Sequence, residues 1–261
     1  VEYFVSYYDY YQPEAYVPRH DLYVEKETSI NEQIDQMRLS ATASLMSRPD
    51  VIIVGSVSSI YGLGSPISYG KVVIDIKLNT TIRRNNLLRQ LVEIQYNRND
   101  TVLKPGTFAV RGDTIEILPP YAEHSYRIDL FGDDVEKILE VNTITGEVHG
   151  IHNDIKIFPA RHFIAEEDKL RLALQDIEHE LQQRIAYFKT EEKHLEAQRI
   201  EQRTLYDLEM LREVGSCSGI ENYSRPLDQR PAGSPPWTLI DYFAADFLLV
   251  IDESHMTIPQ I

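Results

Sequence analysis

Cysteine is almost absent from this sequence, which has one, Cys217, in 261 residues. A disulfide framework is therefore excluded, and a lone thiol suits the reducing cytoplasm, where we expect the protein to reside. No stretch approaches the roughly 18 consecutive apolar residues of a membrane-spanning helix, and no signal peptide opens the chain. We therefore expect no contact with a membrane.

Positive charge is also scarce. The chain carries 26 lysines and arginines against 41 aspartates and glutamates, for a net charge of −15. This balance argues against a general nucleic-acid binder, because affinity for the phosphate backbone comes largely from counterions displaced by basic side chains. A nucleic acid could still be held by threading and stacking. The 8 histidines show no paired spacing and give no reason to expect a zinc site.

A phosphate-binding loop of the form G-x-x-x-x-G-K-[ST] is missing as well. The backbone amides and the lysine of such a loop hold the phosphates of ATP in many nucleotide hydrolases. The chain alone is therefore not expected to hydrolyse ATP. With 43% hydrophobic residues, it is long enough to bury a sizeable core in two or three structural units.

Tyrosine is abundant in one short stretch, Ser6 to Pro18, which holds five tyrosines within ten residues: Tyr7, Tyr8, Tyr10, Tyr11 and Tyr16. Read as a strand, the stretch has tyrosines on both faces, which a half-buried strand does not need. Pro13 and Pro18 restrict it to an edge or a projecting hairpin, with residues 23–26 as the returning strand. Exposed aromatic rings on such a ribbon favour stacking on single-stranded bases. A tyrosine-rich strand packed under a loop is the alternative.

Two apolar runs predict buried strands of an α/β fold. Val51 to Val54 lies between Pro49 and Gly55, as in a buried parallel strand. Phe247 to Ile251 ends in Asp252, Glu253 and His255. An acid at the end of an apolar strand is the Walker B arrangement, in which Asp252 would hold Mg²⁺ and Glu253 would polarise the attacking water. His255 would report the nucleotide state to the DNA-facing parts of the protein.

Residues 71–160 read as a compact α+β insert. Its predicted elements are a helix at Asn85–Ile94 and strands at Thr107–Arg111, Thr114–Leu118 and Ser125–Phe131. One face of the sheet would be wet and would carry Arg111, Arg127 and Asp129, with Arg98 nearby. A partner-binding surface and a merely solvated face both fit this pattern.

The remaining patterns are helical. A helix is expected after the S-x-x-E capping box of Ser29 and Glu32, and its Arg38 would contact a phosphate or, as is usual for a lone arginine, lie on a solvated face. From Glu166 onward apolar residues recur every three or four positions, which predicts a long helix broken near residues 189–193. A second helix, 195–213, would end at a Gly215 cap. This helical segment is expected to be scaffold.

Four blocks of the sequence resemble the UvrB family, the helicase-like subunits of bacterial nucleotide excision repair. They are the tyrosine-rich stretch, the run Asp50–Val54 followed by Ser56–Pro66, Cys217–Arg225 and Asp252–His255, in the family's order. The resemblance implies an α/β fold: a partial RecA-like P-loop helicase domain with a tyrosine-rich β-hairpin, an inserted α+β partner-binding domain and a helical subdomain. The expected domains are 1–70 (hairpin at about 6–26), 71–160, 161–246 and 247–261. Since the chain lacks an initial Met and the phosphate loop, we expect a fragment.

The resemblance also implies a function. The whole protein would accept damaged DNA from UvrA, clamp one strand behind the hairpin with the use of ATP and Mg²⁺, and present the site to the nuclease UvrC. Its DNA-binding residues would be Tyr7, Tyr8, Tyr10, Tyr11, Glu14, Tyr16 and Tyr23. Arg98, Arg111, Arg127 and Asp129 would bind UvrA. Asp129 stands where the family usually has Glu, and Ala109 where an arginine is common.

Two other functions fit parts of the sequence. A non-enzymatic adaptor, the related module of the transcription-repair coupling factor, shares the insert but has lost the motor. The intact Asp252-Glu253-Ser254-His255 argues against it. Another kind of helicase ATPase is the second alternative, and the tyrosine cluster argues against that one.

Overall fold

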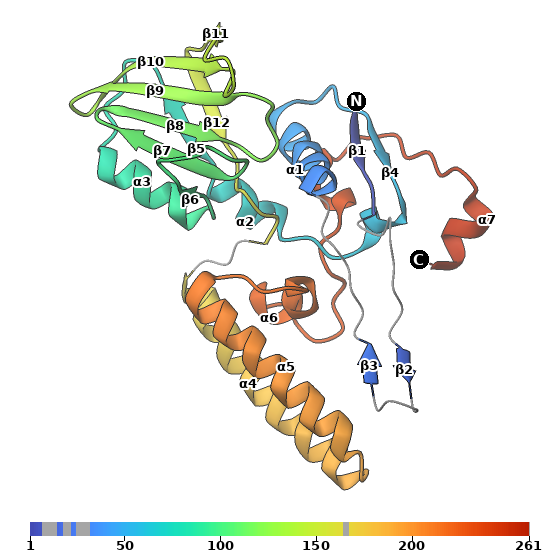
Figure 1. The fold of residues 1–261 in the computed structure, drawn as a ribbon. Helices are drawn as coiled ribbons and strands as arrows, with labels where there is room; N and C mark the ends of the chain where they lie inside the picture. The colour runs from blue at the N-terminus through green and yellow to red at the C-terminus, as the bar shows by residue number, and fades with distance from the viewer. Residues whose placement is uncertain (7–14, 18–21, 25–31, 164–166, 261) are drawn as a thin grey trace. The chain divides into compact units, whose positions relative to one another are not determined.

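The computed structural model describes residues 1–6, 15–17, 22–24, 32–163 and 167–260 (Figure 1). These residues form two compact units with a mixed α/β composition. The first unit contains residues 1–60, 74–160 and 239–261, and the second contains 61–73 and 161–238. Five predicted DNA-binding residues lie outside the described residues: Tyr7, Tyr8, Tyr10, Tyr11 and Glu14.

The chain begins with a short parallel pair of strands. In this pair β1 (Glu2–Phe4) lies beside β4 (Ile53–Gly55), and α1 (Glu32–Ser47) packs against β1. The parallel pairing of β4 was predicted, but its burial was not confirmed, since Val54 is 49% exposed. Among the described residues this sheet has only these two strands, so the side chains of β4 lack the cover that a larger sheet would supply.

Two short strands from the tyrosine-rich region pair with one another. β2 (Ala15–Val17) and β3 (Leu22–Val24) run antiparallel, and the backbones of Tyr16 and Tyr23 lie directly opposite. The pairing agrees with a returning strand near residue 23. The side chains of Tyr16 and Tyr23 lie outside the description, so their DNA-binding role stays a prediction.

The insert is built on a six-stranded sheet in the order β11-β10-β9-β8-β7-β6 (Figure 1). Three strands have the predicted bounds: β7 (Thr107–Arg111), β8 (Thr114–Leu118) and β9 (Ser125–Phe131). The other three were not predicted: β6 (Asn97–Arg98), β10 (Asp134–Val141) and β11 (Val148–Ile151). All neighbours are antiparallel except β6 and β7.

Strand alternation explains the core of the insert. Ile115, Ile117 and Ile128 fall on one face of the sheet and are fully buried. The predicted helix is α3 (Arg84–Glu93), which buries Leu87 and Leu91. A second sheet pairs β5 (Ile74–Lys77) with β12 (Asp154–Ile157), and its buried side chains are Ile74, Ile76, Ile155 and Ile157.

The second unit is dominated by two long helices that lie side by side (Figure 1). These are α4 (Glu167–Thr190) and α5 (His194–Val214), with the break close to its predicted place. The predicted Gly215 cap is confirmed, because Gly215 has φ 70° and its N–H donates to the Leu211 carbonyl at 3.1 Å.

Shorter elements complete this unit: α2 (Pro66–Lys71), η2 (Ile220–Tyr223) and α6 (Ser224–Leu227). The backbone N–H of Leu63 donates to the Trp237 carbonyl at 2.7 Å. Gly64 lies so close to His162 that an added Cβ would overlap the His162 carbonyl oxygen. A residue without a side chain is therefore needed at position 64.

The predicted strand at 247–251 is absent. Between η3 (Leu239–Tyr242) and α7 (Ser254–Thr257), residues 247–251 have no regular secondary structure, and Leu248 and Val250 are 88% and 79% exposed. A strand needs a neighbour to accept and donate its backbone hydrogen bonds, and no described strand pairs with this segment.

The remaining elements are η1 (Val57–Ile60) and η4 (Ile258–Gln260). No helix within the described ranges has the length and apolarity to cross a membrane.

Candidate partner-binding and nucleic-acid sites

Arg98 is held by a carboxylate that sequence reasoning missed. Its Nε and Nη2 atoms donate to Asp100 Oδ2 at 3.0 and 2.8 Å, and Nε also reaches Asp100 Oδ1 at 3.2 Å. Asp100 Oδ1 accepts the backbone N–H of Val110 on β7 at 2.9 Å. The Asp100 carboxylate therefore fixes the Arg98 guanidinium beside the strand that carries Arg111.

The electrostatics of this group agree with its geometry. The hydrogen bonds from Arg98 and from the Val110 amide lower the pKa of Asp100, and the charge of Arg111 acts in the same direction. The same pairing with Asp100 raises the pKa of Arg98. Both side chains remain about half exposed, so the ion pair is screened by water. An ion pair of this kind contributes little to the stability of the fold.

Arg127 is also paired with an acidic residue, Glu116. The two residues lie opposite on β9 and β8, with Arg127 Nη2 3.7 Å from Glu116 Oε1. Glu116 also accepts the Ser125 hydroxyl at 2.8 Å, and only 13% of its side chain is exposed. The side chain of Arg127 is one-third exposed.

Arg111, Thr114 and Asp129 form a row across three adjacent strands. Arg111 pairs with Thr114, and Thr114 pairs with Asp129 and donates its hydroxyl to Asp129 Oδ1 at 2.8 Å. This register places Arg111, Asp129 and Arg127 on the same face of the sheet. Ala109 lies opposite Glu116 on that face and is buried. Three of the four predicted partner-binding residues thus share one face, and Arg98 lies on the edge strand β6.

The sequence had suggested a solvated face for Arg38, but the structure buries this residue. It is 6% exposed, and its guanidinium lies over the Phe4 ring at 3.9 Å from the centroid. Its Nη1 donates to the Val5 carbonyl at 2.9 Å and to the Ser58 hydroxyl at 3.1 Å. Arg38 therefore ties Val5, just before the tyrosine-rich stretch, to the serine loop after β4. Burying a guanidinium requires such acceptors.

The predicted catalytic residues Asp252, Glu253 and His255 are exposed in the structure. Asp252 Oδ1 accepts the backbone N–H of Glu253 at 2.9 Å, and Glu253 has φ 48°. His255 Nδ1 lies 3.3 Å from Glu253 Oε2, and both side chains are 71% exposed. No group of three or more acidic, histidine or cysteine residues that could hold a metal occurs in the described part of the chain. The Mg²⁺ and ATP site was predicted for the longer protein, with a phosphate loop that this chain lacks, and it stays a prediction.

The block Cys217–Arg225 packs against α5. Tyr223 donates its hydroxyl to the buried Asp207 carboxylate at 2.7 Å. Burial and the neighbouring Asp207 raise the pKa of Tyr223, and burial raises the pKa of the Cys217 thiol to about 12. Cys217 and Tyr223 flank the small core of Ile177, Leu208 and Leu211. These features make the block part of the packing of the helical unit.

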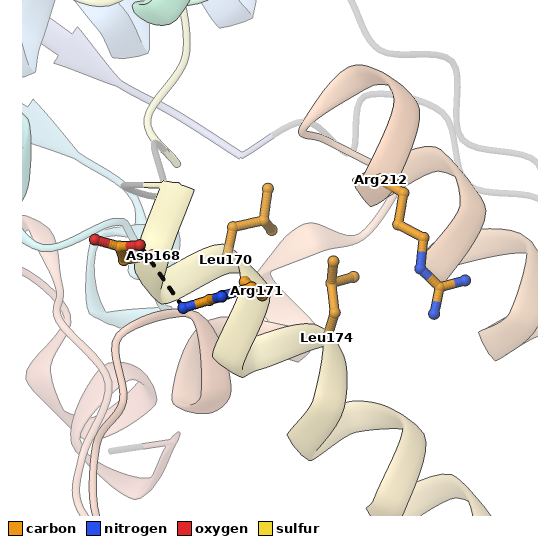
Figure 2. Close-up of a pocket in the computed structure, with 5 residues that line it drawn as sticks. All are labelled: Asp168, Leu170, Arg171, Leu174 and Arg212. Carbon is orange, nitrogen blue, oxygen red and sulfur yellow. Dashed lines mark ion pairs between the residues drawn. The ribbon is translucent and has the colours of Figure 1, made fainter.

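An open pocket of about 330 Å³ lies between α4 and α5 (Figure 2). Asp168 and Arg171 on α4 form an ion pair at 4.0 Å along its wall, and Arg212 projects from α5. Leu170 and Leu174 also line the pocket, and both pack on the helical core. Its charged groups are exposed and do not converge on a common point, so we assign it no ligand.

Comparison with known proteins identifies the family. Residues 74–163 match the UvrB interaction domain, and residues 168–229 match the UvrB third helical domain. The chain belongs to the UvrB family.

Relatives in this family align with the whole chain. The UvrABC system protein B of Geobacillus kaustophilus and that of Bacillus licheniformis are each 59% identical to it, and that of Bacillus subtilis is 56% identical. In each case the chain covers 40% of the relative. The UvrB interaction domain contains all four charged residues described above.

Proposed function

We propose that this chain is the part of a UvrB protein that docks UvrA and probes DNA during nucleotide excision repair. The observation that supports it most is the charged sheet face of Arg111, Arg127 and Asp129, which lies within the match to the UvrB interaction domain. Charged groups on such a face steer the encounter with a partner and set its register. The nuclease UvrC would act after loading.

The tyrosine-rich stretch would supply the contact with DNA. With a net charge of −15, the chain has little electrostatic attraction for phosphates, so stacking must contribute much of the affinity. Base–aromatic stacking is worth about 1–3 kcal/mol per base and tolerates any sequence, as a search for lesions requires. Tyr7 and Tyr8 would lie beside the clamped strand, and Tyr16 and Tyr23 would close over it.

The predicted motor role belongs to the longer protein. Residues 1–70 and 247–261 would form part of a RecA-like domain, with Asp252 as the residue expected to hold Mg²⁺ beside ATP. The exposed apolar residues Leu248 and Val250 support this proposal, because further strands would bury them.

A competition experiment tests the docking role. Excess chain is added to Bacillus subtilis UvrA before the UvrABC system protein B of that organism, and loading on lesion-bearing duplex is followed by mobility shift. We expect the chain to inhibit loading in proportion to its concentration, because it would occupy the docking site of UvrA. Full loading at saturating concentrations of the folded chain would contradict the proposal.

Variants of the full-length protein test the role of the tyrosines. Tyr10→Ala combined with Tyr11→Ala is expected to retain UvrA binding and to lose roughly 30-fold or more in loading on damaged duplex, from the loss of two stacking contacts. Persistent loading by the folded variant would return these residues to a packing role.

A further inference from the structure

We propose that Asp100 is a positioning residue for partner binding, which holds the Arg98 guanidinium in its docking orientation and aligns it with Arg111. This inference rests on the proposed function, since it assigns a role within the same docking surface. Asp100 itself would not need to touch the partner.

The contacts of Asp100 support this role. One carboxylate engages Arg98 through three hydrogen-bond distances of 2.8 to 3.2 Å and accepts the Val110 amide at 2.9 Å. Val110 directly precedes Arg111 on β7. The carboxylate is therefore anchored to the strand backbone and fixes a flexible side chain relative to that strand. An unanchored arginine would lose more conformational entropy on binding than one already oriented.

The charges and the exposed fractions of Arg98 and Asp100 also support this role. Side-chain exposures of 52% for Arg98 and 45% for Asp100 leave the outer part of the guanidinium open to a partner. Asp100 uses the Nε and Nη2 atoms, so Nη1 stays available for a new acceptor. Arg111, which also acts electrostatically on Asp100, would present its own guanidinium nearby. Asp100 also offsets the repulsion between the two positive charges.

The test uses the whole 261-residue chain and purified Bacillus subtilis UvrA. Asp100→Asn keeps an acceptor for the Val110 amide but removes the charge and weakens the hold on Arg98. We expect UvrA affinity to fall about three- to fivefold, the scale of a single exposed charge pair. Asp75→Asn is the matched control, because Asp75 pairs with Lys77 at 3.2 Å with the same sequence spacing and similar exposure, but on β5.

A double-mutant cycle separates positioning from a general structural effect. In an Arg98→Ala background, Asp100→Asn should cost little further affinity, because the side chain that it orients is gone. Thermal unfolding of each variant shows whether the fold is retained. An equal loss in both backgrounds would make Asp100 a structural residue and overturn the inference.

The remaining outcomes are also decisive. If Arg98→Ala weakens UvrA binding but Asp100→Asn does not, the positioning role of Asp100 is contradicted and the docking surface is retained. Tighter binding by Asp100→Asn would mean that Asp100 competes with the partner for Arg98, and this result would also overturn the positioning role of Asp100. If neither Arg98→Ala nor Arg127→Glu changes affinity, the docking surface itself is wrong and the inference falls with it.

Discussion

Glu116 and Arg127 face each other across β8 and β9, with 3.7 Å between Glu116 Oε1 and Arg127 Nη2. A carboxylate at position 127 would face that of Glu116, and like charges directly opposite on a sheet repel. We expect Arg127→Glu to lower the free energy of unfolding by about 0.5–1 kcal/mol, and Glu116→Gln in the same chain to recover most of it. Urea unfolding measures both effects. An Arg127→Glu chain as stable as the wild type would contradict this arrangement.

The two sides of β9 should respond differently to truncation. Ile128 is fully buried, so Ile128→Ala is expected to cost about 2–5 kcal/mol of unfolding free energy through lost burial and a cavity. Phe131, 74% exposed on the same strand, is the control, and Phe131→Ala should change stability by no more than about 0.5 kcal/mol. Equal effects in denaturant melts would mean that the assignment of faces is wrong.

The Cys217 thiol should be unreactive at neutral pH. Burial and the nearby Asp207 and Glu221 carboxylates raise its pKa from 9.0 to about 12, and the reactive form is the thiolate. The rate of labelling by a thiol reagent should therefore still be rising with pH between about 9 and 12. A rate that levels off near pH 9 in the folded chain would contradict the shift.

The same raised pKa predicts a loss of stability in alkali. Between about 9 and 12 the unfolded chain releases the Cys217 proton and the folded chain retains it, so stability falls as pH rises. The contribution is complete below the unfolded pKa. Replacing the thiol by Cys217→Ala should flatten the dependence of the denaturation midpoint on pH. An unchanged slope would exclude Cys217 as its source.

ATP hydrolysis is expected to be absent from the 261-residue chain. Its sequence holds no phosphate loop, so the backbone amides and the lysine that would hold the phosphates are missing. Without the loop, nucleotide affinity should be millimolar or weaker, about 4 kcal/mol of binding at most. Phosphate release by the purified chain is the measurement. Steady ATP turnover that is abolished by Glu253→Gln would mean that the 261-residue chain holds a complete nucleotide site, which would contradict the prediction.

Sequence patterns predicted α3 and three of the six strands of the insert's main sheet, because the signals for these elements are local. Alternating residues in β7, β8 and β9, with Gly112 and Gly132 in their turns at positive φ, specify strands and faces without knowledge of distant segments. The apolar run 247–251 has the composition of a strand, yet strand formation depends on a neighbour that the described chain does not provide.

Contacts between distant residues were the main features that the sequence concealed. The sequence contains Asp100 and Glu116 as two of many acidic residues, and only the fold brings Glu116 opposite Arg127 and Asp100 beside Val110. Arg38 was expected to be solvent-exposed, because a lone arginine usually is. It is instead buried, with its guanidinium over the ring of Phe4 and hydrogen-bonded to the carbonyl of Val5. Such partners follow from tertiary structure, and periodicity contains no information about them.

Affinity for UvrA, measured by titration calorimetry on the folded Arg127→Glu chain, tests the docking proposal most directly. Reversing this charge should weaken binding roughly 30-fold or more, because breaking a charge contact that becomes buried costs about 2 kcal/mol or more. Arg89→Glu, at an exposed position on α3, controls for the change in net charge and should bind like the wild type. Equal affinity for all three chains would contradict the proposal that this sheet face docks UvrA.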